Sequence, residues 1–277
     1  MRRRWRLTFR KLLAAPFIFW IIAGTVIPLG VIGFYGFTTR DRNFTFENIT
    51  AIFTAEHAQA LLLALLLAAI STLICFVLAF PLSLILRSSG LGQKGFMVFI
   101  FILPMWMNFL LRTMAWQVIL EKGGLINAII TSMGFEPLEL INTSGAIVLG
   151  MVYDFLPFMV LPIYNTLMKI DDNIIEAAYD LGATHKRVIW NILLPLSIPG
   201  IASGVTMVFV PALTTFVISN MLGGGKINLI GNIIEQEFTT SANWNLGSGL
   251  SLIMMIFIVG SMMLLSKLDK EGEGNFI

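Results

Sequence analysis

One acidic side chain, that of Asp154, stands well inside a long apolar stretch of this chain. An isolated carboxylate costs at least ~2.5 kcal/mol to bury in a membrane, so it marks a functional site by default. Its charge would attract a cationic ligand, because Coulomb attraction is strong where water is excluded. The structural alternative is an ion pair with Arg112, the obvious cation nearby in the bilayer. The sequence leaves these two interpretations open.

Groups that could perform catalysis are otherwise scarce. The chain contains no HExxH, GxSxG or Walker motif, and its few charged residues do not cluster as an acid–base pair. Its single cysteine, Cys75, lies in an apolar run, and His57 and His185 are too far apart in sequence to indicate a metal site. We therefore predict a protein that is not an enzyme and that holds no cofactor of its own.

The composition is that of a membrane protein. Hydrophobic residues make up 57 % of the chain and charged residues 12 %, against about 25 % charged residues in an ordinary soluble domain. Six apolar segments are each near the ~20 residues that a helix needs to cross a bilayer. They are 14–37, 58–86, 96–111 (an extension to 120 is left open), 141–167, 196–221 and 246–266. We predict an all-α, polytopic protein whose six transmembrane helices occupy 14–266, between tails at 1–13 and 267–277.

Lysine and arginine residues are distributed unevenly between the two sides of these segments. With the N-terminal tail inside, thirteen of them lie inside and five outside. The inner set is Arg2, Arg3, Arg4, Arg6, Arg10, Lys11, Arg87, Lys94, Lys169, Lys186, Arg187, Lys267 and Lys270; the outer set is Arg40, Arg42, Arg112, Lys122 and Lys226. The bias predicts a cell-membrane protein with both termini, and the polar segment between the fourth and fifth spans, in the cytoplasm.

This polar segment has the pattern of two short helices joined by a turn. Three residues offer side-chain oxygens to cap the first helix: Asp171, Asp172 and Asn173. Asn173 with Glu176 forms an approximate capping box. Gly182 follows at the left-handed position that glycine takes without strain. Thr184 is expected to cap the second helix, and Pro195 to end or kink it.

The segment 169–195 resembles the EAA loop of permease subunits in binding-protein-dependent ABC importers. Glu-Ala-Ala stands at 176–178, Gly182 follows after three residues, and Ile-x-Leu-Pro closes the pattern at 192–195. In that family the loop transmits the movement of a separate ATPase to the membrane helices. The resemblance implies the type I ABC importer permease fold. It also implies the coupling residues Glu176, Ala177, Ala178, Asp180, Gly182, Ala183, Leu194 and Pro195.

From about residue 28 to 265 the chain also resembles the permease subunits of spermidine/putrescine-type importers. The specific stretches are LPMWMNFLLRTMAW (103–116), GGLINAII (123–130), VYDFLPFMVLPIYNTL (152–167) and SNMLGGGKINLIGNIIEQEF (219–238). The resemblance implies a heterodimer with a second permease and two cytoplasmic ATPase subunits that bind ATP and Mg. It further implies an external binding protein that delivers a polyamine, and no nucleic-acid partner.

A polyamine would be guided by carboxylates and by aromatic faces, which attract cations. Asp154 and Tyr153 beside it are candidates, together with Trp106, Asn108 and Trp116 around the third apolar segment. Interfacial anchoring is the alternative role for the two tryptophans. Another cargo, such as ferric iron, thiamine or an oxyanion, stays open, although an oxyanion would favour cationic groups. An ion-driven secondary transporter would need several intramembrane ionisable groups and would leave the EAA pattern unexplained.

Overall fold

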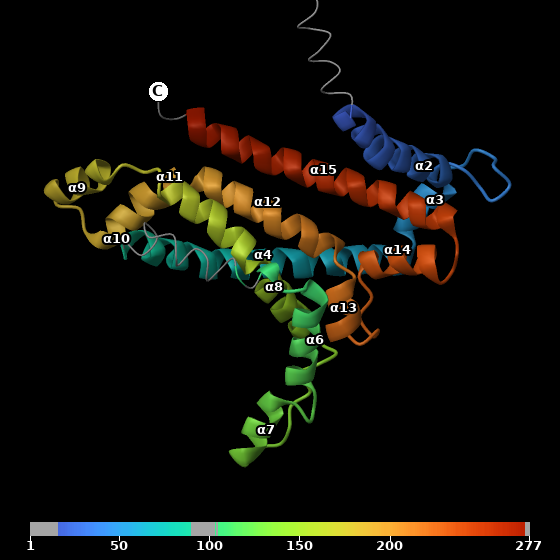
Figure 1. Cartoon of the computed structure of the whole chain (residues 1–277), viewed down its shortest axis with the longest axis horizontal. Coiled ribbons are helices and arrows are strands. Elements are labelled where there is room, and N and C mark those ends of the chain that lie inside the picture. Colours follow the sequence, from blue (N-terminus) through green and yellow to red (C-terminus); the bar gives the residue numbers. More distant parts are fainter. Residues whose placement is uncertain (1–15, 90–102, 104, 275–277) are drawn as a thin grey trace, which may run out of the picture. The chain divides into compact units, whose positions relative to one another are not determined.

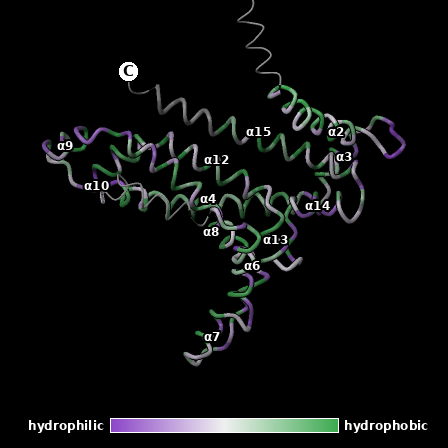
Figure 2. Tube along the Cα trace, in the orientation of Figure 1, coloured by the Kyte–Doolittle hydropathy of each residue, from purple (hydrophilic) through white to green (hydrophobic). Residues whose placement is uncertain are grey.

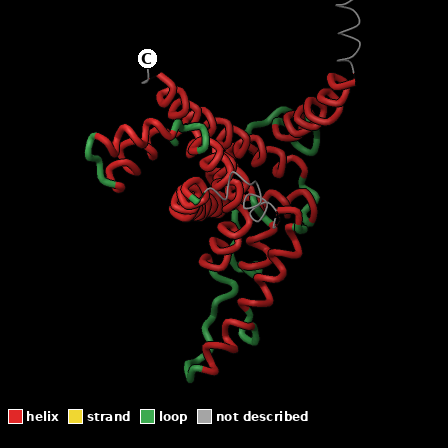
Figure 3. Tube along the Cα trace, turned by 60° about the vertical axis from the view of Figure 1, so that its left-hand side comes forward, coloured by secondary structure: helices red, strands yellow, loops and turns green. Residues whose placement is uncertain are grey.

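Helices account for the regular structure of this protein. The computed structural model describes residues 16–89, 103 and 105–274, with side chains up to residue 264. In those ranges the only strand-like pairing is a bridge between Thr38 and Phe44. The remaining segments are helices, turns and loops (Figure 3). The predicted all-α class is confirmed, and the predicted tail at 1–13 lies outside the described residues.

The chain separates into two compact units. The first combines residues up to 58 with residues 234–257, and the second combines 59–233 with the end of the chain from 258. The first unit contains η1 (Ile22–Val26), α2 (Ile27–Gly36), α3 (Glu47–Thr50) and η2 (Ala51–Phe53), with parts of α14 (Ile230–Thr239) and α15 (Trp244–Gly274).

In the first unit, α2 and α15 approach each other closely at two glycines. A Cβ atom at Gly36 would lie 3.3 Å from the backbone nitrogen of Gly249, so a larger residue would push the helices apart. Nearby, Asn245 Nδ2 donates a hydrogen bond to the carbonyl of Thr38 at 2.6 Å. Small residues and side-chain hydrogen bonds of this kind are typical of contacts between membrane helices.

The second unit is built mainly on three long helices: α4 (Ala55–Ser88), α8 (Ser144–Leu167) and α12 (Ile198–Thr214). α8 and α12 lie side by side (Figure 1). On α12, a Cβ atom at Gly200 would lie 2.5 Å from Thr166 Oγ1, and one at Gly204 would lie 2.7 Å from Met159 Sδ. The two glycines, four residues apart, therefore face α8 and let the two helices approach closely.

α4 contacts α8 through small polar side chains. Ser71 Oγ donates a hydrogen bond to Met151 Sδ at 3.3 Å, and Ser83 Oγ donates one to the carbonyl of Val160 at 3.3 Å. Both serines are buried, which fits the hydrogen bonds they make. The shorter helices of this unit are α6 (Phe109–Leu120), α7 (Leu125–Ser132), α9 (Asp172–Asp180), α10 (His185–Val188), η4 (Ile189–Leu193), α11 (Leu194–Leu196) and α13 (Val217–Leu222).

The helices that could cross a membrane match most of the predicted spans. Four are long and apolar enough: Pro16–Gly36, Ala55–Ser88, Ser144–Leu167 and Trp244–Leu264. A fifth candidate is a pair of helices, His185–Leu196 and Ile198–Thr214, bent by 65°. The polytopic character is confirmed, but the described residues provide four or five spans and not six. The first part of the third predicted span, 96–102, and residue 104 lie outside the described residues, and α6 begins near the end of this span and runs to Leu120.

The fifth predicted span, 196–221, is wrong as one continuous helix. α12 ends at Thr214 and α13 begins at Val217, so two residues separate the helices. Asn232 stabilises this break, because its Nδ2 donates to the carbonyl of Phe216 at 3.1 Å and its Oδ1 accepts from Ser219 Oγ at 2.5 Å. A side chain from α14 thus fixes the first turn of α13, in addition to the helical hydrogen bond that the amide of Asn220 donates to the same Phe216 carbonyl at 2.9 Å.

Hydropathy separates the long helices from the polar segment. Hydrophobic residues run along α4 and α12, whereas hydrophilic residues gather at α9 (Figure 2).

The last helix, α15, continues past the predicted end of the sixth span at 266 and extends to Gly274. The backbone of the predicted C-terminal tail is therefore helical as far as it is described.

Candidate functional site

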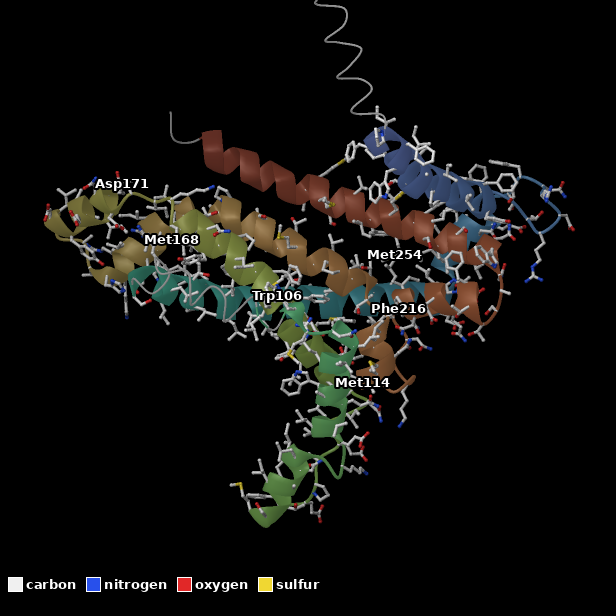
Figure 4. All side chains as sticks on the ribbon, in the orientation of Figure 1. Trp106, Met114, Met168, Asp171, Phe216 and Met254 are labelled. Atoms are coloured by element: carbon white, nitrogen blue, oxygen red, sulfur yellow. The ribbon has the colours of Figure 1, made fainter. Side chains whose placement is uncertain are left out.

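The polar segment 169–195 folds as two short helices, as its pattern predicts. α9 begins after Asp171, whose Oδ1 accepts a hydrogen bond from the amide of Asn173 at 3.0 Å. Asp171, labelled in Figure 4, is therefore the cap among the three predicted candidates. The predicted capping box of Asn173 with Glu176 is wrong, because Asn173 already lies inside the helix. A carboxylate at this end is also favoured by the helix dipole.

Gly182 ends α9 in the predicted left-handed conformation, with φ of +81°. The amide of Gly182 donates to the carbonyl of Tyr179 at 2.9 Å, and the amide of Ala183 donates to the carbonyl of Ala178 at 2.9 Å. This pair of bonds is the Schellman motif, which satisfies the carbonyls left free at a helix end. A side chain at this position would be strained, so the turn depends on glycine.

The second helix of the segment begins at His185 and bends beyond Pro195. Thr184 occupies the cap position, but its side chain makes no cap hydrogen bond, contrary to the prediction. A contact between the helices lies nearby, where the hydroxyl of Tyr179 is 2.8 Å from His185 Nδ1. The chain then turns by 65° at Ser197, two residues after the proline that was predicted to end or kink the helix.

The segment exposes two large apolar side chains, one at the turn after α9 and one in η4. Leu181 is 89 % exposed and Trp190 64 % exposed. Of the predicted coupling residues, Glu176, Ala177, Asp180 and Gly182 are exposed, and Ala178, Ala183, Leu194 and Pro195 are half-buried. Exposed large apolar groups that are rimmed by polar residues are typical of a surface that contacts another protein or a membrane.

One residue near this segment was not predicted as part of the site. Arg87, in the last turn of α4, contacts the start of α9 through Asp172 Oδ1 at 2.8 Å. In the sequence it contributed only to the charge count. A basic residue that closes a long apolar helix is a weak signal, because a lone arginine there also suits the membrane interface.

The second group of predicted residues lies between α6 and α8. Arg112 Nε is 3.4 Å from Asp154 Oδ1, and the two side chains are only 7 % and 2 % exposed. Thr113 Oγ1 donates a hydrogen bond to the other carboxylate oxygen at 3.3 Å. In the described part of the chain, Asp154 Oδ1 and the Nε and Nη1 atoms of Arg112 have no hydrogen-bond partner. The structure thus forms the ion pair that was one of the two interpretations, but the contact between Arg112 Nε and Asp154 Oδ1 is not a hydrogen bond.

Two predicted aromatic residues meet beside this pair. The rings of Trp116 on α6 and Tyr153 on α8 have centroids 5.4 Å apart and planes inclined at 72°. Edge-to-face contacts of this kind stabilise aromatic pairs. Tyr153 is 40 % exposed, whereas Asp154 beside it is buried. The aromatic pair therefore lies on an accessible surface next to the ion pair.

Asn108 and Trp106 do not join this group. Asn108 Oδ1 accepts a hydrogen bond from the amide of Leu110 at 2.8 Å and caps α6. Its side-chain oxygen therefore has a structural role. Trp106, labelled in Figure 4, precedes this cap and is 80 % exposed, outside the helix that carries Arg112 and Trp116.

Comparison with known sequences gives matches over most of the chain. The model of the family described as "Binding-protein-dependent transport system inner membrane component" matches residues 76–270. The chain is 35 % identical over 262 residues to the spermidine/putrescine transport system permease protein PotB of Haemophilus influenzae, covering 90 % of this chain and 92 % of that protein. It is 34 % identical over 254 residues to PotB of Escherichia coli K12, covering 88 % and 92 %.

Comparison with solved structures gives the same architecture at lower sequence identity. A bacterial ABC transporter involved in the import of the acidic polysaccharide alginate matches with a TM-score of 0.81 at 17 % identity, over 97 % of this chain and 99 % of that one. The methionine ABC transporter MetNI, in an inward-facing conformation, matches with a TM-score of 0.56 at 18 % identity, over 78 % and 95 %. At these identities the likeness concerns the fold alone.

Proposed function

The chain belongs to the family of binding-protein-dependent transport system inner membrane components, and we propose that its cargo is a polyamine. It is the permease subunit of an ABC importer, has the type I permease fold, and is a transport protein and not an enzyme. The observation that carries the proposed cargo is the match to permeases named for spermidine and putrescine, which extends over 92 % of their length.

The chemistry between α6 and α8 supports a cationic cargo. Trp116 and Tyr153 offer aromatic faces to ammonium groups. Asp154 offers a carboxylate whose contact with Arg112 is not aligned for hydrogen bonding. An ammonium group that donates a well-aligned hydrogen bond can therefore compete with Arg112 for this carboxylate. Trp106 and Asn108 stay candidates for the approach to this site.

The proposed assembly follows the family pattern. This chain pairs with a second permease, two cytoplasmic ATPase subunits bind ATP and Mg, and an external binding protein delivers the cargo. Both termini and the segment 169–195 face the cytoplasm in this arrangement, as the lysine and arginine bias favours. The solved relative with a bound periplasmic protein carrying an alginate pentasaccharide supports the presence of such a delivery subunit.

Within this assembly the segment 169–195 couples the ATPase to the membrane helices. Closure of the ATPase dimer displaces α9, and the continuous chain through α10 and α11 carries the displacement to α12. The exposed side chain of Leu181, the carboxylate of Glu176 and the rigid turn at Gly182 suit this docking role. The permease pair then changes from an inward-facing to an outward-facing state, and ATP hydrolysis resets it.

The cargo is tested by reconstituting the chain with its own partner subunits in proteoliposomes. ATP-dependent uptake of labelled spermidine and putrescine is the expected result. Labelled thiamine, a ferric chelate and sulfate are measured in parallel, and the affinity of the cognate binding protein for each compound is measured by titration calorimetry. Uptake of one of the other solutes, with no uptake of polyamine, would overturn the proposed cargo.

The coupling role is tested with substitutions in the segment. Glu176→Lys and Gly182→Asp are expected to abolish uptake and to make ATP hydrolysis independent of the loaded binding protein, with assembly retained. ATP hydrolysis that is still fully stimulated in both variants would remove the coupling role from this segment. Uptake driven by an ion gradient without ATP would instead indicate a secondary transporter.

A further inference from the structure

Arg87 connects the end of α4 to the segment 169–195, called the coupling segment below, through two hydrogen bonds from one nitrogen. Its Nη2 donates to Asp172 Oδ1 at 2.8 Å and to the carbonyl of Ile170 at 2.8 Å. The Arg87 side chain is only 11 % exposed, while that of Asp172 is 81 % exposed. The guanidinium thus holds the backbone just before α9 and the first residue of α9 at the same time.

A groove separates the rest of the coupling segment from α4. It has a volume of about 580 Å³ and runs between the last turns of α4 and the helices α9, α10 and η4. Leu84 and Ile85 line it on the α4 side, and Ile175 and Val188 on the other side. Because the groove leaves room between these apolar surfaces, α9 and α10 are not packed tightly against α4 there.

We infer that Arg87 is a positioning residue through which displacement of α9 moves α4. The groove allows α9 to tilt, and the two bonds of Arg87 fix the point about which it tilts. α4 contacts α8 through Ser71 and Ser83, so a force on Arg87 reaches the helix that carries Asp154. This inference rests on the proposed coupling role of the segment 169–195.

The chemistry of the contact favours a mechanical role over a purely stabilising one. An ion pair with an exposed carboxylate such as Asp172 contributes little to stability, because water competes for both charges. Arginine nevertheless provides a planar group that holds two acceptors in fixed directions, which a lysine does not do. The same contact can therefore be weak as a source of stability and effective as a directional link.

The experiment uses the complete reconstituted complex and measures the ratio of binding-protein-stimulated to unstimulated ATP hydrolysis. Arg87→Gln is expected to lower this ratio about tenfold, within the range of free-energy coupling between distant sites. Arg87→Lys is expected to give an intermediate ratio, because an ammonium group can donate to both acceptors but rotates freely and does not fix their directions as the planar guanidinium does. Co-purification of the ATPase subunits, measured in the same preparations, reports assembly separately.

The control is Lys122→Gln, which removes an exposed ion pair with Glu139 far from this contact in sequence and is expected to leave the ratio unchanged. If Arg87→Gln keeps full stimulation while Gly182→Asp abolishes it, the link through Arg87 is wrong and the coupling role stands. If both variants keep full stimulation, the proposed coupling role itself is wrong. If Arg87→Gln does not assemble, Asp172→Asn decides: a lowered ratio supports the link, and full stimulation overturns it.

Discussion

The guanidinium of Arg112 lies 3.4 Å from the carboxylate of Asp154, and both side chains are buried between α6 and α8. The contact brings opposite charges together without the aligned hydrogen bonds that usually accompany a buried ion pair. Thr113 supports the carboxylate from the same helix as Arg112. The pair is thus neutral overall but open to competition from a better donor, and its variants can separate a structural role from a transport role.

The first prediction concerns the stability of this pair. Arg112→Met and Asp154→Leu each leave one buried charge without its partner, which typically costs about 3–5 kcal/mol. The double variant removes both charges and is expected to recover most of the thermal stability of the purified complex. Midpoints of thermal unfolding in detergent measure this, and additive losses in the double variant would contradict a direct pair.

The same variants decide between the two interpretations of Asp154. If the carboxylate binds the cargo, the double variant is stable but takes up little polyamine. If the pair is only structural, stability and uptake recover together. Asp154→Asn keeps the shape of the side chain and is expected to reduce uptake more than assembly. Normal uptake in this variant would remove Asp154 from the pathway.

The second prediction concerns the aromatic contact between Trp116 and Tyr153. Tyr153→Phe keeps the ring and is expected to leave polyamine uptake close to that of the parent protein. Tyr153→Leu removes the aromatic face and is expected to raise the apparent KM about three- to tenfold, as the loss of about 1 kcal/mol of cation–π attraction implies. Trp116→Leu should act in the same direction. Equal uptake kinetics in the Phe and Leu variants would exclude a cation–π role.

The sequence predicts those parts of the fold that follow from local composition. The spans at 58–86 and 141–167 were found because long apolar runs leave few alternatives to helix. The break between α12 and α13 was missed because it depends on Asn232, which reaches it from another helix. The packing of Gly204 against α8 corresponds to a local sequence pattern, because Gly200 and Gly204 are spaced four residues apart, as small residues at contacts between membrane helices often are.

For the candidate site, the prediction held where one residue determines the geometry. Gly182 takes the left-handed conformation because any other side chain would be strained there. The sequence predicted the cap of α9 only as one of three neighbouring residues, because an aspartate or asparagine at each position can cap a helix. The position of the first hydrogen-bonded turn selects Asp171. The role of Arg87 depends on residues more than eighty positions away, which no local pattern reveals.

The third prediction tests the close approach of α8 and α12. Gly204→Leu places a side chain where Met159 already lies, so it is expected to destabilise the complex by about 1–3 kcal/mol and to lower the yield of assembled protein. Gly260→Leu is the matched control, because apart from its chain neighbours and the backbone of its own helix no described atom lies within 4 Å of a Cβ atom at that glycine. Size-exclusion profiles and thermal midpoints measure both variants. Equal losses in the two variants would mean that the Gly204 contact has no special role.

The last prediction concerns the loop after α7, in which Glu139 Oε1 lies 2.9 Å from Nζ of Lys122, a residue that precedes α7. The hydrogen bond from Lys122, together with its charge, lowers the pKa of Glu139 from its ordinary value of 4.5. A lowered pKa in the folded state means that the pair stabilises the loop above the unfolded pKa and ceases to do so as the pH falls through the folded pKa. Because both side chains are exposed, the effect is small and is weakened by salt.

Hydrogen exchange of residues 133–140 measures this effect when parent and variant are compared at the same pH. Lys122→Gln is expected to exchange faster than the parent at about pH 7, and the difference is expected to shrink toward about pH 3 as the pH falls through the lowered pKa of Glu139. Asn127→Ala should loosen the loop at both pH values, because the Asn127 amide, which donates to the carbonyl of Leu138 at 3.0 Å, does not titrate. A difference between Lys122→Gln and the parent that is the same at both pH values would mean that the charge of Glu139 is not what the lysine stabilises.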